Sequence, residues 1–568
     1  MRICYRRRVI PLPAPALPRR RALAALLAAL ALASCARPRE GGTDAGRWFG
    51  SVVPPRANVL RFNNETEPET LDPGLMSGQP DGRAARLMFE GLTTQDPQTL
   101  APGPGQAYRW ETSADGRTVT FHLRPGLVWS DGTPLLAADF AWSWRRVLAP
   151  ASAARAADLL DPIAGAEAFR GGATADPGGV GVRAPDDTTL VVTLAHPTPW
   201  FLFLTGLPTL APVPRRAIER WGGAWTEPGH TVGNGPFTLV RHRYGDRLEF
   251  ARNERYWDAA NVRLDGVIAY EVDDLDTSTN LYKAGAIDWN PSGDIPSPFL
   301  PYLRGYGDYV TGDYQATYFY SVNTTLAPFG DVHVRRALNL AIDRVAICRD
   351  LLKDTRRPWG RIVPSGYPGY DPPPEVRFDP DSARRELARA GFPGGRGFPR
   401  FSILFNTSED HRRIAEAVQA MWRRELNVPA ELENQEFASF MDATTHLRYA
   451  VARRSWIGDY LDPGTFLGIL RTGDGNNRTG WSDVRYDALL HDAEGEADPA
   501  RRLALLREAE SRALDAAVFL PIYHYRTHEL VKPYVRGLFH NALDVHPLTH
   551  VWIDRDWRQH EPIAARER

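Results

Sequence analysis

The chain has 568 residues, of which 43% are hydrophobic and 24% charged, and its formal net charge is −1. A chain of this length exceeds what one hydrophobic core supports, so two or three domains are expected. Residues 1–34 contain seven Arg and no acid, which leaves −8 for the rest of the chain. That mildly acidic remainder has no basic run, which argues against nucleic acid and anionic membrane surfaces as partners.

The N-terminus predicts a lipoprotein signal peptide over residues 1–34. Two Arg triplets, at 6–8 and 19–21, precede an uncharged Ala/Leu run over 22–33. This run is shorter than the roughly 20 apolar residues that cross a bilayer. Small residues precede Cys35, so we expect Cys35 to become the acylated first residue of the mature chain and to anchor it to a membrane. The alternative is a plain signal peptide with an incidental Cys. Residues 35–55 are predicted to be a flexible tether.

Cys348 is the one cysteine left after the predicted signal and its cleavage site. No internal disulfide is therefore possible. Cys348 follows a helical pattern and is predicted to be a small buried side chain rather than a nucleophile.

The predicted elements mix strands and helices. Alternating apolar residues predict strands at 117–123 and 188–194, and a hairpin over 237–250 that turns at 244–246. Asp379 with Pro380 starts a helix that stops at Gly391, and apolar spacing predicts further helices after Asp331 and over 411–426. Because no strict strand-helix-strand repeat is seen, we expect an α/β protein with mixed sheets.

Residues 453–467 (RRSWIGDYLDPGTFL) contain the most informative segment. A short buried strand is predicted over 449–452, and Asp462-Pro463-Gly464 is turn chemistry. Trp456 and Asp459 should then lie on irregular backbone at a strand end, where ligand-binding residues often lie. A core Trp beside a turn-forming Asp explains the same spacing.

Short runs along most of the chain are similar to those of one family. They lie at 67–73, 89–92, 121–134, 234–237, 253–257, 331–337, 453–467 and 520–523. In order and spacing they resemble the periplasmic oligopeptide-binding proteins, which are family 5 solute-binding proteins of ABC peptide importers. The resemblance implies a two-lobed, hinged periplasmic binding protein fold, class II and cluster C type, with an extra inserted domain. It places lobe I at 56–89, 208–315 and 525–568, the inserted domain at 90–207 and lobe II at 316–524.

The resemblance also implies a binding site. Asp459 would hold the α-ammonium of a peptide, Trp456 would wall a side-chain pocket, and residues 449–457, with Arg453, Ser455 and Ile457 among them, would offer an edge strand. Arg453 and Arg454 could meet a ligand carboxylate bidentately or pair with acids on the protein surface, and we expect a structural role for one of them and leave the other open. Five further positions match pocket residues of the family, although packing or a surface role explains each of them equally well: His411, Phe437, Trp142, Tyr314 and Phe319. Ser77 stands where relatives carry an acid, and Thr444 stands where they carry Arg; both changes leave the preferred peptide length and charge open.

The implied function is delivery of oligopeptides to an ABC permease and its ATPase subunits by a monomeric, membrane-anchored lipoprotein of the periplasm. Receptors of the same fold for dipeptides, murein peptides, nickel or sugars are alternatives. No cofactor or metal is expected, since His524 and His528 fall on a predicted strand, where a spacing of four does not converge as on a helix. The sequence has no His-Glu-x-x-His, Gly-x-Ser-x-Gly or Ser-x-x-Lys motif, so an exported hydrolase is the weaker alternative.

Overall fold

The computed structural model describes residues 47–76, 78–293, 295–496 and 498–560. The predicted signal peptide, Cys35, Ser77 and most of the predicted tether lie outside these residues. The fold described below is that of the compact unit Phe49–Arg568. Among the helices that could be searched, none combines the length and the apolar character needed to cross a membrane.

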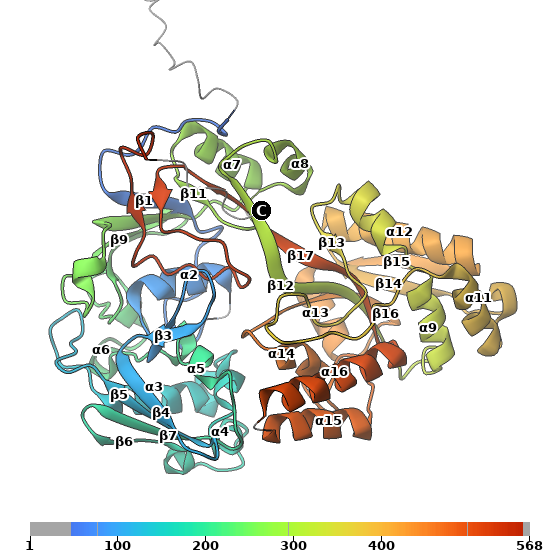
Figure 1. Cartoon of the computed structure of the whole chain (residues 1–568), viewed down its shortest axis with the longest axis horizontal. Coiled ribbons are helices and arrows are strands. Elements are labelled where there is room, and N and C mark those ends of the chain that lie inside the picture. Colours follow the sequence, from blue (N-terminus) through green and yellow to red (C-terminus); the bar gives the residue numbers. More distant parts are fainter. Residues whose placement is uncertain (1–46, 77, 294, 497, 561–568) are drawn as a thin grey trace, which may run out of the picture. The chain divides into compact units, whose positions relative to one another are not determined.

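A mixed sheet of eleven strands is the frame of this unit (Figure 1). Its order is β15-β14-β16-β12-β17-β11-β1-β10-β9-β8, and β13 also pairs with β17. The strands are β1 (Val59–Asn63), β8 (Phe237–Arg243), β9 (Arg247–Arg252), β10 (Gly266–Tyr270), β11 (Trp289–Asn290), β12 (Tyr309–Val322), β13 (Arg357–Pro358), β14 (Phe401–Asn406), β15 (Ala430–Gln435), β16 (Val451–Ile457) and β17 (Phe519–Val531). The predicted hairpin over 237–250 is confirmed as β8 and β9, and Gly245 supplies the positive φ of 68° at its turn.

β12 and β17 are the longest strands of the sheet, and they pair antiparallel with each other. Their register shifts between Asp313 and Thr317 and again between Tyr318 and Phe319. The lobe boundaries expected at 315/316 and 524/525 fall inside these two strands. Those boundaries stay a prediction.

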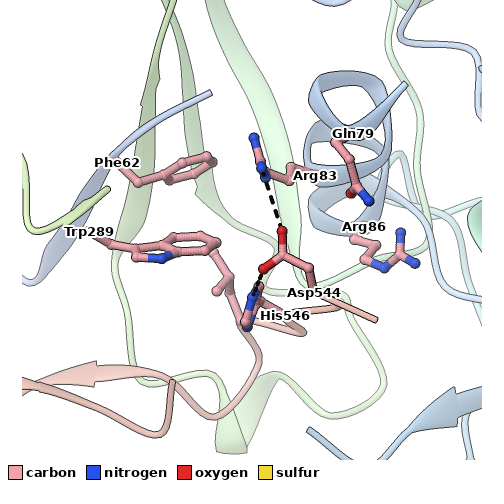
Figure 2. A pocket seen from close by; sticks show the side chains of 8 residues that line it. Phe62, Gln79, Arg83, Arg86, Trp289, Asp544 and His546 are labelled. Carbon is pink, nitrogen blue, oxygen red and sulfur yellow. Dashed lines mark hydrogen bonds and ion pairs between the residues drawn. The ribbon is translucent and has the colours of Figure 1, made fainter. Parts of the chain in front are cut away.

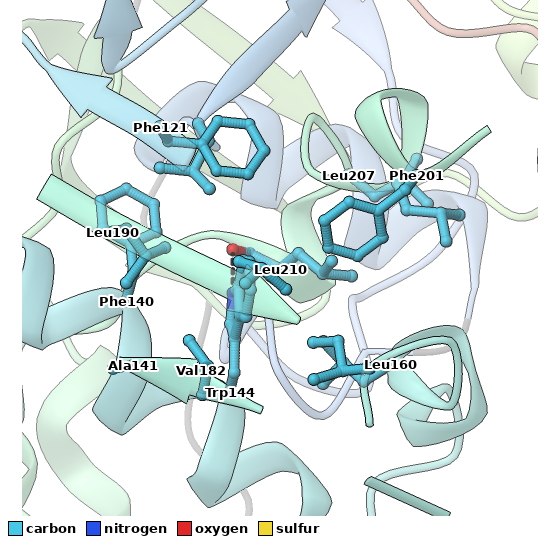
Figure 3. Packing of buried hydrophobic residues seen from close by; sticks show 14 of the residues in the cluster. Phe121, Phe140, Ala141, Trp144, Leu160, Val182, Leu190, Phe201, Leu207 and Leu210 are labelled. Carbon is cyan, nitrogen blue, oxygen red and sulfur yellow. Dashed lines mark hydrogen bonds between the residues drawn. The ribbon is translucent and has the colours of Figure 1, made fainter. Parts of the chain in front are cut away.

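A second sheet is antiparallel, with the order β4-β5-β7-β6. It consists of β4 (Ala107–Thr112), β5 (Thr118–Leu123), β6 (Val182–Asp186) and β7 (Thr189–Thr193), and it packs with α3 (Ala137–Leu148), α4 (Ala166–Arg170) and α5 (Phe201–Leu204). The two strands predicted from alternation are confirmed as β5 and β7. Figure 3 shows the core of this region, where the Trp144 indole N–H donates to the carbonyl of Leu210 at 2.8 Å. This core draws its residues from 92–210, with Leu543 and Val545 added from the C-terminal segment.

Several helices of the remaining parts begin at a capping Asp or Ser. Asp379 accepts from the Ser382 N–H at the start of α11, and Asp331 accepts from the His333 N–H at the start of α9. These helices and the predicted helix over 411–426, now α12, are confirmed. The helices are α2 (Gln79–Met88), α6 (Arg215–Trp221), α7 (Leu275–Ala284), α8 (Leu300–Leu303), α9 (Val332–Leu340), α10 (Arg344–Ala346), α11 (Pro380–Arg389), α12 (Glu409–Leu426), α13 (Phe437–Thr445), α14 (Gly464–Leu467), α15 (Val484–Gly495) and α16 (Pro499–Ala516).

The part of the sheet near β12 and β16 is covered on both faces. Tyr318 and Tyr320 join the core that contains α9, α11 and α12, whereas Phe319 joins the core of α14, α15 and α16. This alternation is expected because successive side chains of a strand point to opposite faces. Cys348 is buried and free in the first of these cores, as predicted. Two short pairs, β2 (Thr93–Gln95) with β3 (Pro102–Pro104) and β18 (Val535–Arg536) with β19 (Trp552–Ile553), complete the sheets.

Candidate ligand-binding site

Strand β16 runs through the segment that the sequence marked as informative. Its pairing with β12 continues without a shift from Ala316↔Ile457 to Val322↔Val451, and Trp456 lies opposite Thr317. The prediction of irregular backbone is therefore wrong for Trp456, because pairing with β12 carries the strand six residues beyond its first residue. It is correct for Asp459, which lies in the bend that follows.

One edge of β16 loses its neighbour part of the way along. β14 pairs with Val451 and Ala452 and with no later residue of the strand in the described ladder. The Gly458 N–H donates to the carbonyl of Gln315 next to β12, at 2.8 Å. Because backbone groups alternate sides in an antiparallel pair, Ser455 and Ile457 turn their N–H and C=O groups away from β12. The free edge, defined here as residues 453–457 on the side away from β12, is narrower than the expected 449–457.

Asp459 lies where this free edge ends. Its side chain is exposed, yet desolvation by the surrounding protein raises the pKa of its carboxyl to about 6. A carboxylate that is exposed to water and yet surrounded by protein atoms lies in a concave part of the surface. The Thr465 hydroxyl donates to Oδ2 at 3.1 Å and accepts from the Asp459 N–H at 3.1 Å. No Lys, Arg or His of the described chain forms an ion pair with this carboxylate.

Arg453 lies at the other end of the free edge and carries the charge opposite to that of Asp459. Its guanidinium donates to Asn406 Oδ1 and Ser455 Oγ, both at 3.3 Å, and lies 5.0 Å from the centre of the Tyr318 ring. Its Nε is buried with no hydrogen-bond partner, and no described acid pairs with it. Arg453 is thus a cation held by neutral groups.

His411 completes this cationic end of the edge. It lies in the first turn of α12, and its ring is 5.6 Å from that of Tyr318. Burial, and then the charge of Arg453, lower the pKa of His411 to about 3, so the ring is neutral at physiological pH. The Nδ1 atom is buried and has no hydrogen-bond partner among the residues that the structure describes.

Arg454 points to the other face of the sheet and has a different role. It is 8% exposed, it donates to the carbonyl of Asn476 at 2.9 Å, and it lies 5.8 Å from the ring of Phe319. Burial, and then the charge of Arg478, lower its pKa to about 10. Of the two arginines left open by the sequence, Arg454 is thus placed as the structural one. A ligand contact of Arg453 stays a prediction.

The predicted aromatic residues divide between the site and the core. Trp456 is half-buried and packs against the same core of α14, α15 and α16 that contains Phe319, and its indole N–H has no hydrogen-bond partner among the described residues. Phe437 is 57% exposed at the first residue of α13. Phe319, in contrast, is 1% exposed and stacks on Phe519 with 3.5 Å between ring centres. The expectation that Phe319 contacts a ligand is therefore corrected, because its ring faces the core of α14, α15 and α16.

Two other predicted residues belong to other elements, and one of them, Tyr314, directly precedes Gln315, whose carbonyl accepts from the Gly458 N–H. Trp142 is on α3, and the contact described for its ring is with Arg215 of α6, at 5.6 Å. Tyr314 lies on β12 at the register shift, and its carbonyl accepts from His524 Nε2 at 2.7 Å. Burial, and then the negative charge of Asp544, raise the pKa of the Tyr314 hydroxyl. Sequence reasoning missed Thr465 and Asn406, since each acts through a contact with a residue distant in sequence.

Thr444 lies buried on α13, where relatives carry Arg according to the resemblance. Its hydroxyl accepts from Arg478 Nη1 at 3.1 Å and donates to the carbonyl of Met441 at 3.1 Å. The guanidinium of Arg478, from another segment of the chain, therefore contacts Thr444 at this position.

A separate hollow of about 20 Å³ lies between α2 and the C-terminal segment (Figure 2). That volume holds about one water molecule. Asp544 lies between Arg83, at 3.7 Å from Nη2, and His546, whose Nε2 is 2.9 Å from Oδ1. The hollow is too small for an organic ligand and is lined by groups that pair with one another.

Glu529, Asp544 and His546 have ligand atoms within 4.8 Å of one another, as a metal site would. Their contacts favour an ion-pair network instead. Burial alone would lower the pKa of His546, but the charge of Glu529 and the contact with Asp544 raise it. Burial alone would raise the pKa of Asp544, but His546 lowers it. His546 Nε2 lies 2.9 Å from Asp544 Oδ1 and 3.8 Å from Glu529 Oε2, and Arg83 Nη2 lies 3.7 Å from Asp544 Oδ2, so the charges of this cluster are balanced by one another.

The comparisons with known proteins assign this arrangement to a class. The family model described as "Bacterial extracellular solute-binding proteins, family 5 Middle" matches residues 101–478. The chain belongs to family 5 of the bacterial extracellular solute-binding proteins, and the predicted two-lobed α/β fold is that of its structural neighbours. The family and these neighbours are binding proteins, and membership indicates an extracytoplasmic location.

Individual relatives are similar over most of their length. The periplasmic oligopeptide-binding protein OppA of Salmonella typhimurium is 34% identical over 530 residues, which are 90% of this chain and 94% of OppA. The probable deoxycholate-binding periplasmic protein YgiS of Escherichia coli is 34% identical over 502 residues, 86% of this chain and 92% of YgiS. The crystal structure of Haemophilus influenzae OppA in complex with RPPGFSPFR has a TM-score of 0.76 and 31% identity, covering 88% of this chain and 100% of that one.

Proposed function

We propose that this protein captures oligopeptides outside the cytoplasm and delivers them to an ABC permease. The observation that carries the proposal is the free edge of β16, with Asp459 at one end and Arg453 at the other, neither of them ion-paired within the described residues. Peptides of any sequence share an α-ammonium, a backbone and a carboxylate. The free edge offers Asp459 to the ammonium, its own backbone to the peptide backbone, and Arg453 to the carboxylate.

The ligand would lie antiparallel to β16. Its ammonium would pair with Asp459, its backbone would bond to Ser455 and Ile457, and its carboxylate would meet Arg453 with His411. An ammonium-carboxylate pair of this kind is worth roughly 1.5–3 kcal/mol. Backbone bonds are independent of side chains, which suits a receptor for many sequences.

The distance between the two charges suits short peptides. Six residues separate Arg453 from Asp459, and a strand rises about 3.4 Å per residue, so the two Cα atoms lie at most about 20 Å apart. Both side chains can reach toward the ligand and shorten this span. Peptides of about three to five residues therefore fit between Arg453 and Asp459. Trp456 and Phe437 would bound the pockets for the side chains of these peptides.

The remaining features belong to the same proposal. Acylation at Cys35, which lies outside the described residues, would hold the protein to a membrane as a monomer. The protein would transfer its ligand unchanged and catalyse no reaction.

The experiment is a melting-temperature measurement on protein lacking residues 1–35, refolded to remove ligand carried over from expression. A ligand that binds only the native state raises stability by RT ln(1 + [L]/Kd). Pooled di- to pentapeptides should raise the Tm, and Asp459→Ala should abolish the rise. Nickel, a sugar panel and deoxycholate serve as competing solutes. A Tm rise with one of these and none with peptides would contradict the proposal, as would hydrolysis of the peptides.

A further inference from the structure

Trp200 contacts the turn that carries Asp459 although it is distant in sequence. The ring of Trp200 stacks on that of Tyr460, the residue after Asp459, with 5.2 Å between centres and 3° between planes. Parallel aromatic pairs of this kind contribute about 0.5–1.5 kcal/mol beyond the area that they bury. Tyr460 and Leu461 both pack against the core of residues 92–210.

The backbone of Trp200 is fixed by its own neighbours. Trp200 directly precedes α5, and Phe201, the first residue of that helix, is 1% exposed and contacts Trp144 edge-on at 6.3 Å. The Trp200 ring is therefore presented from a packed core and not from a free loop.

The other end of the turn is held from α16. Arg502 donates to both oxygens of Asp462, at 2.6 and 2.9 Å, and both residues are buried. The same guanidinium lies 4.7 Å from the centre of the Trp200 ring. Trp200 thus contacts the residue after Asp459 and also the cation that holds Asp462.

The core of residues 92–210 acts on Asp459 electrostatically as well. After desolvation and the Thr465 hydrogen bond, the charge of Asp158 is the next influence on the Asp459 carboxyl. Asp158 lies in a 3-10 turn, Ala157–Leu160, of that same region. A cation at Asp459 would therefore be attracted by a second carboxylate from this side.

We propose that Trp200 is a positioning residue of the ammonium site: its stack on Tyr460 fixes the turn that presents Asp459 and couples the core of residues 92–210 to ligand capture. This inference rests on the proposed peptide-binding function. Trp200 itself needs no contact with the ligand.

The test compares a free-amine tetrapeptide of alanine with its N-acetyl form, by calorimetric titration of the ligand-free protein. Trp200→Ala should reduce the preference for the free amine about tenfold, because Asp459 is no longer held in place. Trp200→Phe keeps an aromatic ring and should retain most of the preference. Trp221→Ala is the matched control, since Trp221 is 38% exposed at the end of α6 and stacks on His230.

Three results would overturn the inference. Trp200→Ala could keep the wild-type preference, or it could weaken both peptides equally, which would indicate a general structural role. In the double variant Trp200→Ala/Tyr460→Ala, fully additive losses would show that the effect does not pass through the stack. Failure of the wild-type protein to bind either peptide would instead refute the proposed function itself, and the inference with it.

Discussion

Asp459 and Arg453 lie at opposite ends of the free edge of β16, and neither has a partner of opposite charge in the described part of the chain. Charges that the surrounding protein desolvates are normally paired, because removal from water is costly. Two unpaired charges of opposite sign on one strand edge therefore indicate a site that a dipolar ligand completes. The hydrogen bonds that each makes, to Thr465 and to Asn406, orient the side chain without neutralising it.

Removing the charge of Asp459 should weaken peptides that carry a free amine. Asp459→Asn keeps the shape and the contact with Thr465, but it loses the charge-assisted pair. We expect about 10- to 100-fold weaker binding, in line with roughly 1.5–3 kcal/mol for such a pair. Calorimetric titration checks this. N-acetylated peptides should bind both proteins alike, and Asp276→Asn, an exposed acid on α7, should change nothing.

Peptide affinity should fall in acid. The ammonium pairs with the ionised form of Asp459, whose pKa is about 6. Lowering the pH from 7 to 5 should weaken binding about tenfold, because most of the carboxyl is then protonated. A flat profile between pH 7 and pH 5 would contradict this assignment, and Asp459→Asn should flatten it.

The stability of the ligand-free protein should change in the opposite sense. The pKa of Asp459 is higher in the folded chain than its ordinary 3.8, so this group favours folding most at low pH. Its contribution is fully present below about pH 3.8 and is lost as the pH rises through about 6. Asp459→Asn should therefore raise the Tm at pH 7.5 more than at pH 4.5. Equal shifts at both pH values would contradict the expectation.

Arg453 and Arg454 offer a matched pair of substitutions. Arg453→Gln should weaken peptides with a free carboxylate about tenfold and leave C-terminally amidated peptides unaffected. Arg454→Gln should leave affinity unchanged but lower the unfolding free energy by about 1–3 kcal/mol, since it breaks a buried hydrogen bond to Asn476. Titration and denaturant unfolding separate the two effects. If Arg454→Gln weakened peptide binding and Arg453→Gln lowered only the unfolding free energy, the ligand contact would belong to Arg454 and the structural role to Arg453.

Trp144 and Trp142 test the second sheet and its helices. Trp144 is 0% exposed and donates to the Leu210 carbonyl. Trp144→Ala should therefore lower the free energy of unfolding by about 3–5 kcal/mol, because it leaves a cavity and removes this hydrogen bond. Trp142, one half-turn earlier on α3, is half-buried, so Trp142→Ala should lower the free energy of unfolding much less. Denaturant unfolding followed by tryptophan fluorescence measures both. Similar losses would mean that Trp142 also belongs to the core.

Local signals in the sequence predicted several elements correctly. Asp379 with Pro380 marked the start of α11, and alternation marked β5 and β7, because caps and strand faces depend on neighbouring residues. Residues 453–457 were harder to predict. Arg453, Arg454 and Ser455 have little preference for strands, and only pairing with β12 extends β16 through them.

By itself, the sequence determined the turn at Asp459, the helix ends and the similarity to family 5, since these depend on short runs of residues. The tertiary structure alone decided that β14 leaves β16 after Ala452, which creates the free edge. It also decided that Arg453 meets no acid in the described part of the chain while Arg454 is buried, and that Phe319 packs against Phe519. Side chains adjacent in sequence point to opposite faces of a strand, and what each face meets is set by other segments of the chain, such as Asn406 for Arg453 and Asn476 for Arg454.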